Sequence, residues 1–142
     1  MLVIPTLFVQ GCERPDPELI PDEYLQSELG LTTDDRVHTL SVSAAAAEVA
    51  EPDTVRIEPG DIVQFISVDW FVHEVHFELD SMTAAARDFL LDTEQASSPP
   101  LLQNGSRFVL SFRDAPEGRY PYQILGNTAA GGGLIVVHGP EN

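Results

Sequence analysis

From Val37 onward, the sequence is a series of short β-type runs separated by turn signals. Apolar and polar residues alternate over 37–42, and Glu58-Pro59-Gly60-Asp61 and Ala115-Pro116-Glu117-Gly118 have the composition of tight turns. The remaining β-type runs are 54–57, 62–67, 73–77, 108–112, 119–123 and 133–138. Regularly spaced short strands with such turns are typical of sandwiches and barrels. The sequence therefore predicts one mostly β domain over 37–142.

Two segments of this domain depart from the β pattern. Residues 81–94 carry apolar side chains at helical spacing, and Ser81 is suited to the N-cap. These apolar residues are Met82, Ala85, Ala86, Phe89 and Leu90. An amphipathic helix laid across the sandwich is expected there. The alanine-rich stretch 44–50 could be helical, but its place favours a loop between the first two strands.

The charge of the chain limits its partners. The 142 residues include 23 Asp and Glu against seven Arg and no Lys, which gives a formal net charge of −16. Such a chain is repelled by nucleic acids and anionic membrane surfaces and attracted to basic protein surfaces. We expect no nucleic-acid binding. The acidity either serves solubility or favours a partner with a basic contact surface.

The N-terminal residues 1–12 form an apolar segment that ends at Cys12, the single cysteine. The segment is too short to span a bilayer, and Val9-Gln10-Gly11-Cys12 resembles a bacterial lipobox. No Arg or Lys precedes Cys12, so the basic start of a signal peptide is missing. Lipidation of Cys12, an uncleaved apolar tail held by a partner or membrane, and an ordinary strand all stay open. The first two predict a membrane-anchored, periplasmic (extracytoplasmic) protein.

Residues 13–36 are rich in Pro, Asp and Glu and are interpreted as an acidic linker holding one short helix. Pro21 suits a first helical turn and Gly30 a stop. Tyr24 and Leu25 lie on the apolar edge of this helix and are candidates for partner binding.

Three segments together resemble the cupredoxin family in their order and spacing. Residues 55–65 look like the strand-turn-strand that opens its core, and 69–77 look like the segment of its first copper-ligand histidine. Residues 118–127, continuing through 131–137, look like the C-terminal ligand hairpin of plastocyanin and its relatives. The resemblance covers about 37–138. It implies a cupredoxin-like Greek-key β-sandwich, here with one inserted helix and an extended N-terminal segment.

The resemblance also implies where copper ligands should stand. Blue copper requires two histidines and a thiolate with a weak axial group. His73 matches the first histidine, but Ile124 stands at the cysteine position, Asn127 at the second histidine and Gly132 near the methionine. We therefore predict no cofactor and no blue-copper site, with His73 as a vestigial ligand position. Cys12 is too distant in sequence to replace the thiolate.

The region around His73 offers two further hypotheses. His73 and His76 should point to opposite faces of their strand, which disfavours a two-histidine pair. A non-standard metal site could instead join His73 to a carboxylate such as Asp69 or Glu74. Trp70 and Phe71 precede His73, where cupredoxins meet their partners. They form either a docking patch or lids on the core.

No arrangement of nucleophile and base has supporting spacing, so we do not expect an enzyme. The favoured function is a membrane-anchored, non-catalytic cupredoxin-like subunit that docks on and stabilises a redox or photosynthetic membrane complex. This partner class follows by analogy with cupredoxins, which dock on such complexes. The alternative is a metal-binding or electron-transfer protein with a non-standard copper site at His73.

Overall fold

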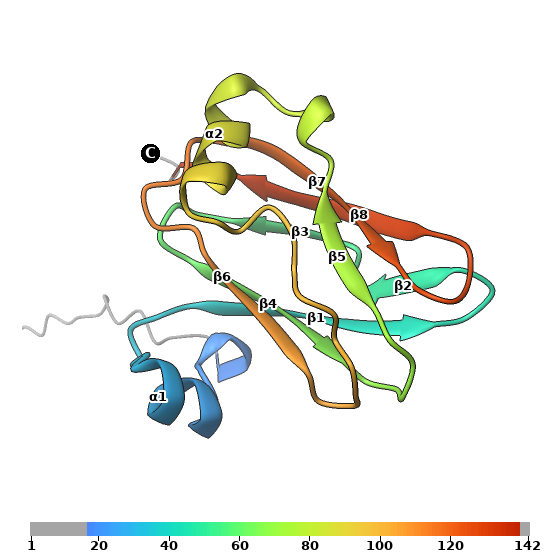
Figure 1. The fold of residues 1–142 in the computed structure, drawn as a ribbon. Helices are drawn as coiled ribbons and strands as arrows, with labels where there is room; N and C mark the ends of the chain where they lie inside the picture. Colours follow the sequence, from blue (N-terminus) through green and yellow to red (C-terminus); the bar gives the residue numbers. More distant parts are fainter. Residues whose placement is uncertain (1–16, 140–142) are drawn as a thin grey trace, which may run out of the picture.

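The computed structural model describes residues 17–139, which form two four-stranded sheets packed face to face (Figure 1). The first sheet has the order β2 (Glu48–Glu51), β1 (Val37–Ala44), β4 (Ile62–Ser67) and β6 (Arg107–Ser111). The second has the order β3 (Thr54–Ile57), β8 (Gly131–Val137), β7 (Gly118–Leu125) and β5 (Glu74–Phe77). β1 pairs with β4, and β3 with β8, in parallel, whereas the other pairs are antiparallel. The predicted β-sandwich with an inserted helix is confirmed.

The core between the sheets follows the period-two pattern of the strands. On β7, Tyr120, Tyr122 and Ile124 are buried while the residues between them are more exposed. Tyr122 meets Phe65 of the facing sheet edge-on, with ring centroids 5.0 Å apart. Both tyrosines satisfy their hydroxyls, because Tyr120 donates to Pro116 O at 2.7 Å and Tyr122 to Asp53 O at 2.8 Å. The aromatic layer thus holds the two sheets together without an unpaired hydroxyl group.

The helix α1 (Glu23–Leu29) covers the outer face of the first sheet (Figure 1). Asp22 is its N-cap and accepts from Leu25 N at 3.0 Å, and Gly30 ends it with a left-handed φ of 71°. Leu25 is 0% exposed and packs in a cluster with Val37 and Ile62. The helix and its stop were predicted correctly, but its first turn follows Asp22 and not Pro21.

The position of α1 corrects two expectations. A short 3₁₀ turn, η1 (Pro17–Leu19), precedes it, so the described part of the predicted linker is folded onto the domain. Leu25 was a partner-binding candidate, and this was wrong because the domain's own sheet buries its side chain. Tyr24 stays 48% exposed, with the Arg107 guanidinium 4.5 Å from its ring centre. Residues 1–16, and with them Cys12, lie outside the described residues.

The predicted inserted helix is α2 (Ala84–Asp92), and it begins later than expected. Thr83 is the N-cap and accepts from Ala86 N at 3.2 Å, whereas Ser81 belongs to a 3₁₀ turn, η2 (Leu79–Ser81). The buried side chains of α2 are Ala86 and Leu90, and Phe89 meets the Phe112 ring at 5.8 Å. No helix within residues 17–139 is long and apolar enough to cross a membrane.

The alanine-rich stretch 44–50 was interpreted as a loop, and this was wrong for its second half. β1 continues to Ala44 and β2 begins at Glu48, so only a tight turn separates them. Alanine carries little strand preference, but Ala47 and Ala129 form a β-bridge and Glu48 N donates to Ala129 O at 2.8 Å. Residues 48–51 form a strand because they pair antiparallel with the end of β1, and the bridge to Ala129 adds a contact with the β7–β8 hairpin.

Candidate functional site

The candidate site is the end of the sandwich where β5 begins, and His73 is at its centre. His73 immediately precedes β5 and is 0% exposed. Its backbone is fixed by two hydrogen bonds with Leu101, with His73 N donating at 3.2 Å and Leu101 N donating at 2.7 Å. Its side chain points inward like those of Val75 and Phe77, whereas His76 lies on the outer face. The prediction that His73 and His76 face opposite ways agrees with this burial pattern.

Glu48 of β2 is the first partner of the His73 ring. Its Oε1 lies 2.6 Å from His73 Nδ1, and the Glu48 residue is only 2% exposed. Its other oxygen, Oε2, accepts from Thr128 N at 3.1 Å and from the Thr128 hydroxyl. A side-chain carbon at Gly126 would overlap the Glu48 carboxylate, and one at Gly131 would overlap its backbone carbonyl. The glycines of the β7–β8 hairpin therefore make room for Glu48.

Asp69, in the loop between β4 and β5, is the second partner. Its Oδ1 lies 2.7 Å from His73 Nε2 and also accepts from Phe71 N at 3.1 Å. Its Oδ2 accepts from Ala44 N at 2.8 Å. Although burial opposes it, the bonds from His73, Ala44 N and Phe71 N hold the pKa of Asp69 below its usual range. Of the two carboxylates considered beside His73, Asp69 reaches it, whereas Glu74 binds His76 Nε2 at 2.9 Å instead.

The residues at this end do not fit a blue-copper ligand set. Ile124, which the sequence resemblance assigns to the cysteine position, is 0% exposed and contributes only an apolar side chain. Asn127 is exposed, and a side chain at Gly132 would overlap the Tyr122 carbonyl. Both ring nitrogens of His73 already face carboxylate oxygens. Across residues 17–139, no group of three or more His, Cys, Asp and Glu side chains is arranged to hold a metal ion.

The surface of the same end is apolar. Trp70 is 73% exposed and Phe71 51% exposed, so the interpretation of these rings as lids on the core is wrong. Other large exposed apolar residues in these loops are Val68, Val72, Leu102 and Leu125. We call the set 68, 70–72, 102 and 125 the apolar end. Figure 1 shows the loops that carry it, together with the β1–β2 and β7–β8 turns, at the end away from α2.

Charge is excluded from these loops to an unusual degree for this chain. Residues 43–47, 68–72, 99–106 and 125–133 contain one charged residue, Asp69. Its carboxylate is bound to His73 and so does not project outward. Apart from Asp69, the charged residues of the chain lie outside these four segments.

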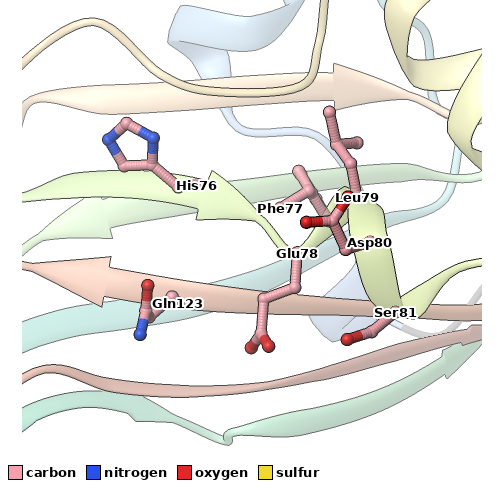
Figure 2. Close-up of a pocket in the computed structure, with 7 residues that line it drawn as sticks. All are labelled: His76, Phe77, Glu78, Leu79, Asp80, Ser81 and Gln123. Carbon is pink, nitrogen blue, oxygen red and sulfur yellow. The ribbon is translucent and has the colours of Figure 1, made fainter.

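A second surface feature lies on the outer side of β5. Figure 2 shows a shallow depression whose walls carry Glu78 and Asp80 on one side and His76 and Gln123 on the other. Phe77, Leu79 and Ser81 complete its lining. The depression is open and mostly polar, and His76 is already paired with Glu74. It does not join the His73 side chain, which faces the interior.

Sequence reasoning missed two residues that the structure brings to buried histidines. Glu48 is a lone acid in an alanine-rich run, and this was the signal available for it. Asp61 ends the predicted turn and lies 2.9 Å from His38 Nε2, at the opposite end of β1 and β4. Although burial opposes it, the His38 bond, the Glu58 N–H and the Arg36 charge hold the pKa of Asp61 below its usual range.

The two packed sheets and their strand order define the class: the chain has a cupredoxin-like fold. It is similar to oxidised plastocyanin from Dryopteris crassirhizoma, with 17% identity, a TM-score of 0.52, and coverage of 70% of this chain and 99% of that one. A purple cupredoxin from Nitrosopumilus maritimus matches at 19% identity and a TM-score of 0.47, over 71% of this chain and 99% of that one. A reduced amicyanin variant matches at 19% identity and a TM-score of 0.48, over 72% and 82%. No protein-family model and no curated protein matches the chain.

Proposed function

We propose that the protein is a non-catalytic, extracytoplasmic cupredoxin-like subunit, held at a membrane by its N-terminal segment, that docks on and stabilises a redox or photosynthetic complex. The observation that carries this proposal is the apolar end, exposed in a chain whose net charge is −16. A cupredoxin-like fold is typical of electron-transfer proteins, which makes a redox assembly the natural class of partner.

The chemistry of the apolar end suits a protein contact. Trp70 and Phe71 offer large, rigid apolar surfaces, and tryptophan is among the residues that most often dominate binding energy. Their loops place no charged side chain outward, so an apolar partner surface can close over them without burying an unpaired charge. Exposed aromatic rings grouped in this way are typical of binding surfaces.

The acidic side chains would act on the approach of the partner and not on the contact itself. Charged side chains such as Glu78 and Asp80 line the depression beside β5 (Figure 2), and Asp69 is the one charged residue in the loops of the apolar end. Charge outside the contact steers approach toward a basic partner surface and adds little to the final affinity. The partner is therefore expected to present an apolar patch with basic residues around it.

The alternative, electron transfer through a non-standard copper site at His73, has little support from the site. The ring is 0% exposed and both of its nitrogens face carboxylates. Ile124 offers no donor where a thiolate would be needed. A catalytic role has the same difficulty, because a fully buried histidine cannot contact a substrate.

Site-specific crosslinking in native membranes tests the docking proposal. A photo-reactive amino acid in place of Trp70 should crosslink to a subunit of a membrane complex. The matched control replaces Leu91, which is also apolar and 49% exposed but lies on α2 at the other end. Crosslinks from the position of Leu91 and not of Trp70 would overturn the assignment of the surface.

A further inference from the structure

The place where this fold would hold a metal ligand set is filled by charged side chains of the chain itself. We propose that Glu48, His73 and Asp69 form a buried ionic triad in which a doubly protonated His73 is the central cation. In this role the imidazolium takes the place of a metal ion and ties together the loops of the apolar end. The link to the loops of the apolar end rests on the proposed docking function, but the charge of the triad does not depend on it.

The charge of His73 follows from the donors and acceptors around it. Asp69 accepts hydrogen bonds from two backbone N–H groups, and Glu48 accepts from the N–H and hydroxyl of Thr128. Hydrogen bonds donated to a carboxylate favour its ionised form, and an ionised carboxylate has no proton to give to the ring. Between two ionised carboxylates, His73 Nδ1 and Nε2, at 2.6 and 2.7 Å from their oxygens, both act as donors. An imidazole that donates from both nitrogens carries a positive charge.

Among the residues that the structure describes, the ion pairs of the His73 ring are with Glu48 and Asp69 alone. The backbone of Leu101 is bonded to that of His73, and Leu101 brings only an apolar side chain. Glu74 and His76 are paired with each other on the outer face of β5. The triad therefore carries two negative charges against one positive, and its surplus charge is met by the N–H groups of Ala44, Phe71 and Thr128.

These N–H groups belong to the end of β1, the β4–β5 loop and the β7–β8 hairpin, and this gives the triad its structural effect. Asp69 fixes the end of β1 through Ala44 and its own loop through Phe71. Glu48 fixes the β7–β8 hairpin through Thr128. His73 joins the two carboxylates. Removal of the central cation would leave both carboxylates without a positive partner and loosen the three segments that they hold.

The triad also closes the site to metal ions. A metal binds the lone pair of a neutral imidazole nitrogen, and an imidazolium has none. Glu48 fits closely against the hairpin, since Gly126 and Gly131 lack the side chains that would displace it. The Glu48 carboxylate thus acts as the counter-ion of His73 and occupies the side of Nδ1 where a metal ion would bind.

Nitrogen-15 NMR of the histidine rings in the full chain tests the charge directly, without any partner. We expect His73 to show protons on both ring nitrogens at neutral pH, with imidazolium chemical shifts. One proton on the ring, with the shifts of a neutral tautomer, would overturn the proposal. Failure of the docking proposal leaves this result unchanged, because the measurement concerns the isolated protein.

Amide hydrogen exchange tests the link to the loops. Glu48→Gln keeps the size of the side chain but removes its charge, and Glu74→Gln is the matched control on the outer face. In Glu48→Gln, hydrogen exchange at the Thr128 N–H should rise by about tenfold or more. Exchange at the Phe71 N–H should rise as well, because His73 links Glu48 to Asp69. Glu74→Gln should change neither. Equal exchange in the two variants would show that the triad does not hold the loops.

Discussion

The two ends of the sandwich each bury a histidine beside a carboxylate, but they balance its charge differently. At one end, Asp61 accepts from His38 at 2.9 Å and also has the Arg36 guanidinium at 3.7 Å. At the other, His73 alone stands between two carboxylates. If His38 is lost, Asp61 keeps the permanent cation of Arg36. If His73 is lost, Glu48 and Asp69 keep no cation. A buried histidine beside a carboxylate therefore matters more for stability where no second cation is present.

The largest expected effect comes from removal of the His73 ring. His73→Gln leaves the buried Glu48 carboxylate and the partly exposed Asp69 carboxylate without a cation, which should lower the free energy of unfolding by about 3–5 kcal/mol. His38→Gln should cost only about 1–2 kcal/mol, because Arg36 and the Glu58 N–H still serve Asp61. Urea unfolding of both variants measures the difference. Equal losses at the two ends would contradict the comparison.

The packing of α1 gives the next largest effect. Leu25→Ala should lower the free energy of unfolding by about 2–4 kcal/mol, because the side chain is fully buried against the first sheet. Leu29→Ala is the control, since Leu29 is 48% exposed on the same helix. Removal of residues 1–36 should therefore destabilise the sandwich by uncovering Val37 and Ile62. A truncated chain as stable as the full one would refute this account of α1.

Docking should depend on the apolar end and not on apolar exposure in general. Trp70→Ala should weaken binding to the partner complex by about 1–3 kcal/mol if the ring is a buried anchor. Leu91→Ala on α2 should leave affinity unchanged, and neither change should alter stability by more than about 0.5 kcal/mol. Binding measured at two salt concentrations separates the contributions, because added salt should slow association more than it speeds release.

The smallest effect is a pH dependence at the His38 end. The pKa of Asp61 is lower in the folded state than in the unfolded chain, so the unfolded state binds more protons at acid pH. The stability that Asp61 contributes is full above its unfolded pKa and is lost as pH falls through its folded pKa. Asp61→Asn should cost about 1–2 kcal/mol at neutral pH and less near about pH 3. If Asp61→Asn lowered the free energy of unfolding equally at both pH values, this pH dependence would be contradicted.

The sequence predicted the sandwich well because strand alternation and turn chemistry are local. Gly60 has the positive φ of 99° that its turn needs, and Gly30 ends α1 as expected. The site was harder to predict because its parts are distant along the chain. Asp69 could be considered beside His73 from their short spacing, whereas Glu48 reaches it only through the pairing of β2 with β1. Leu25 was misjudged because nothing local reveals which face of a short helix meets a sheet.

Copper titration of the full chain, followed by visible absorption, tests the central claim most directly. We propose that the His73 end has an ionic triad and an apolar surface in place of a blue-copper centre. The account predicts no stoichiometric copper binding at His73 and no intense thiolate-to-copper band, because Ile124 supplies no thiolate and both His73 nitrogens are engaged. Stoichiometric copper accompanied by that band would contradict it.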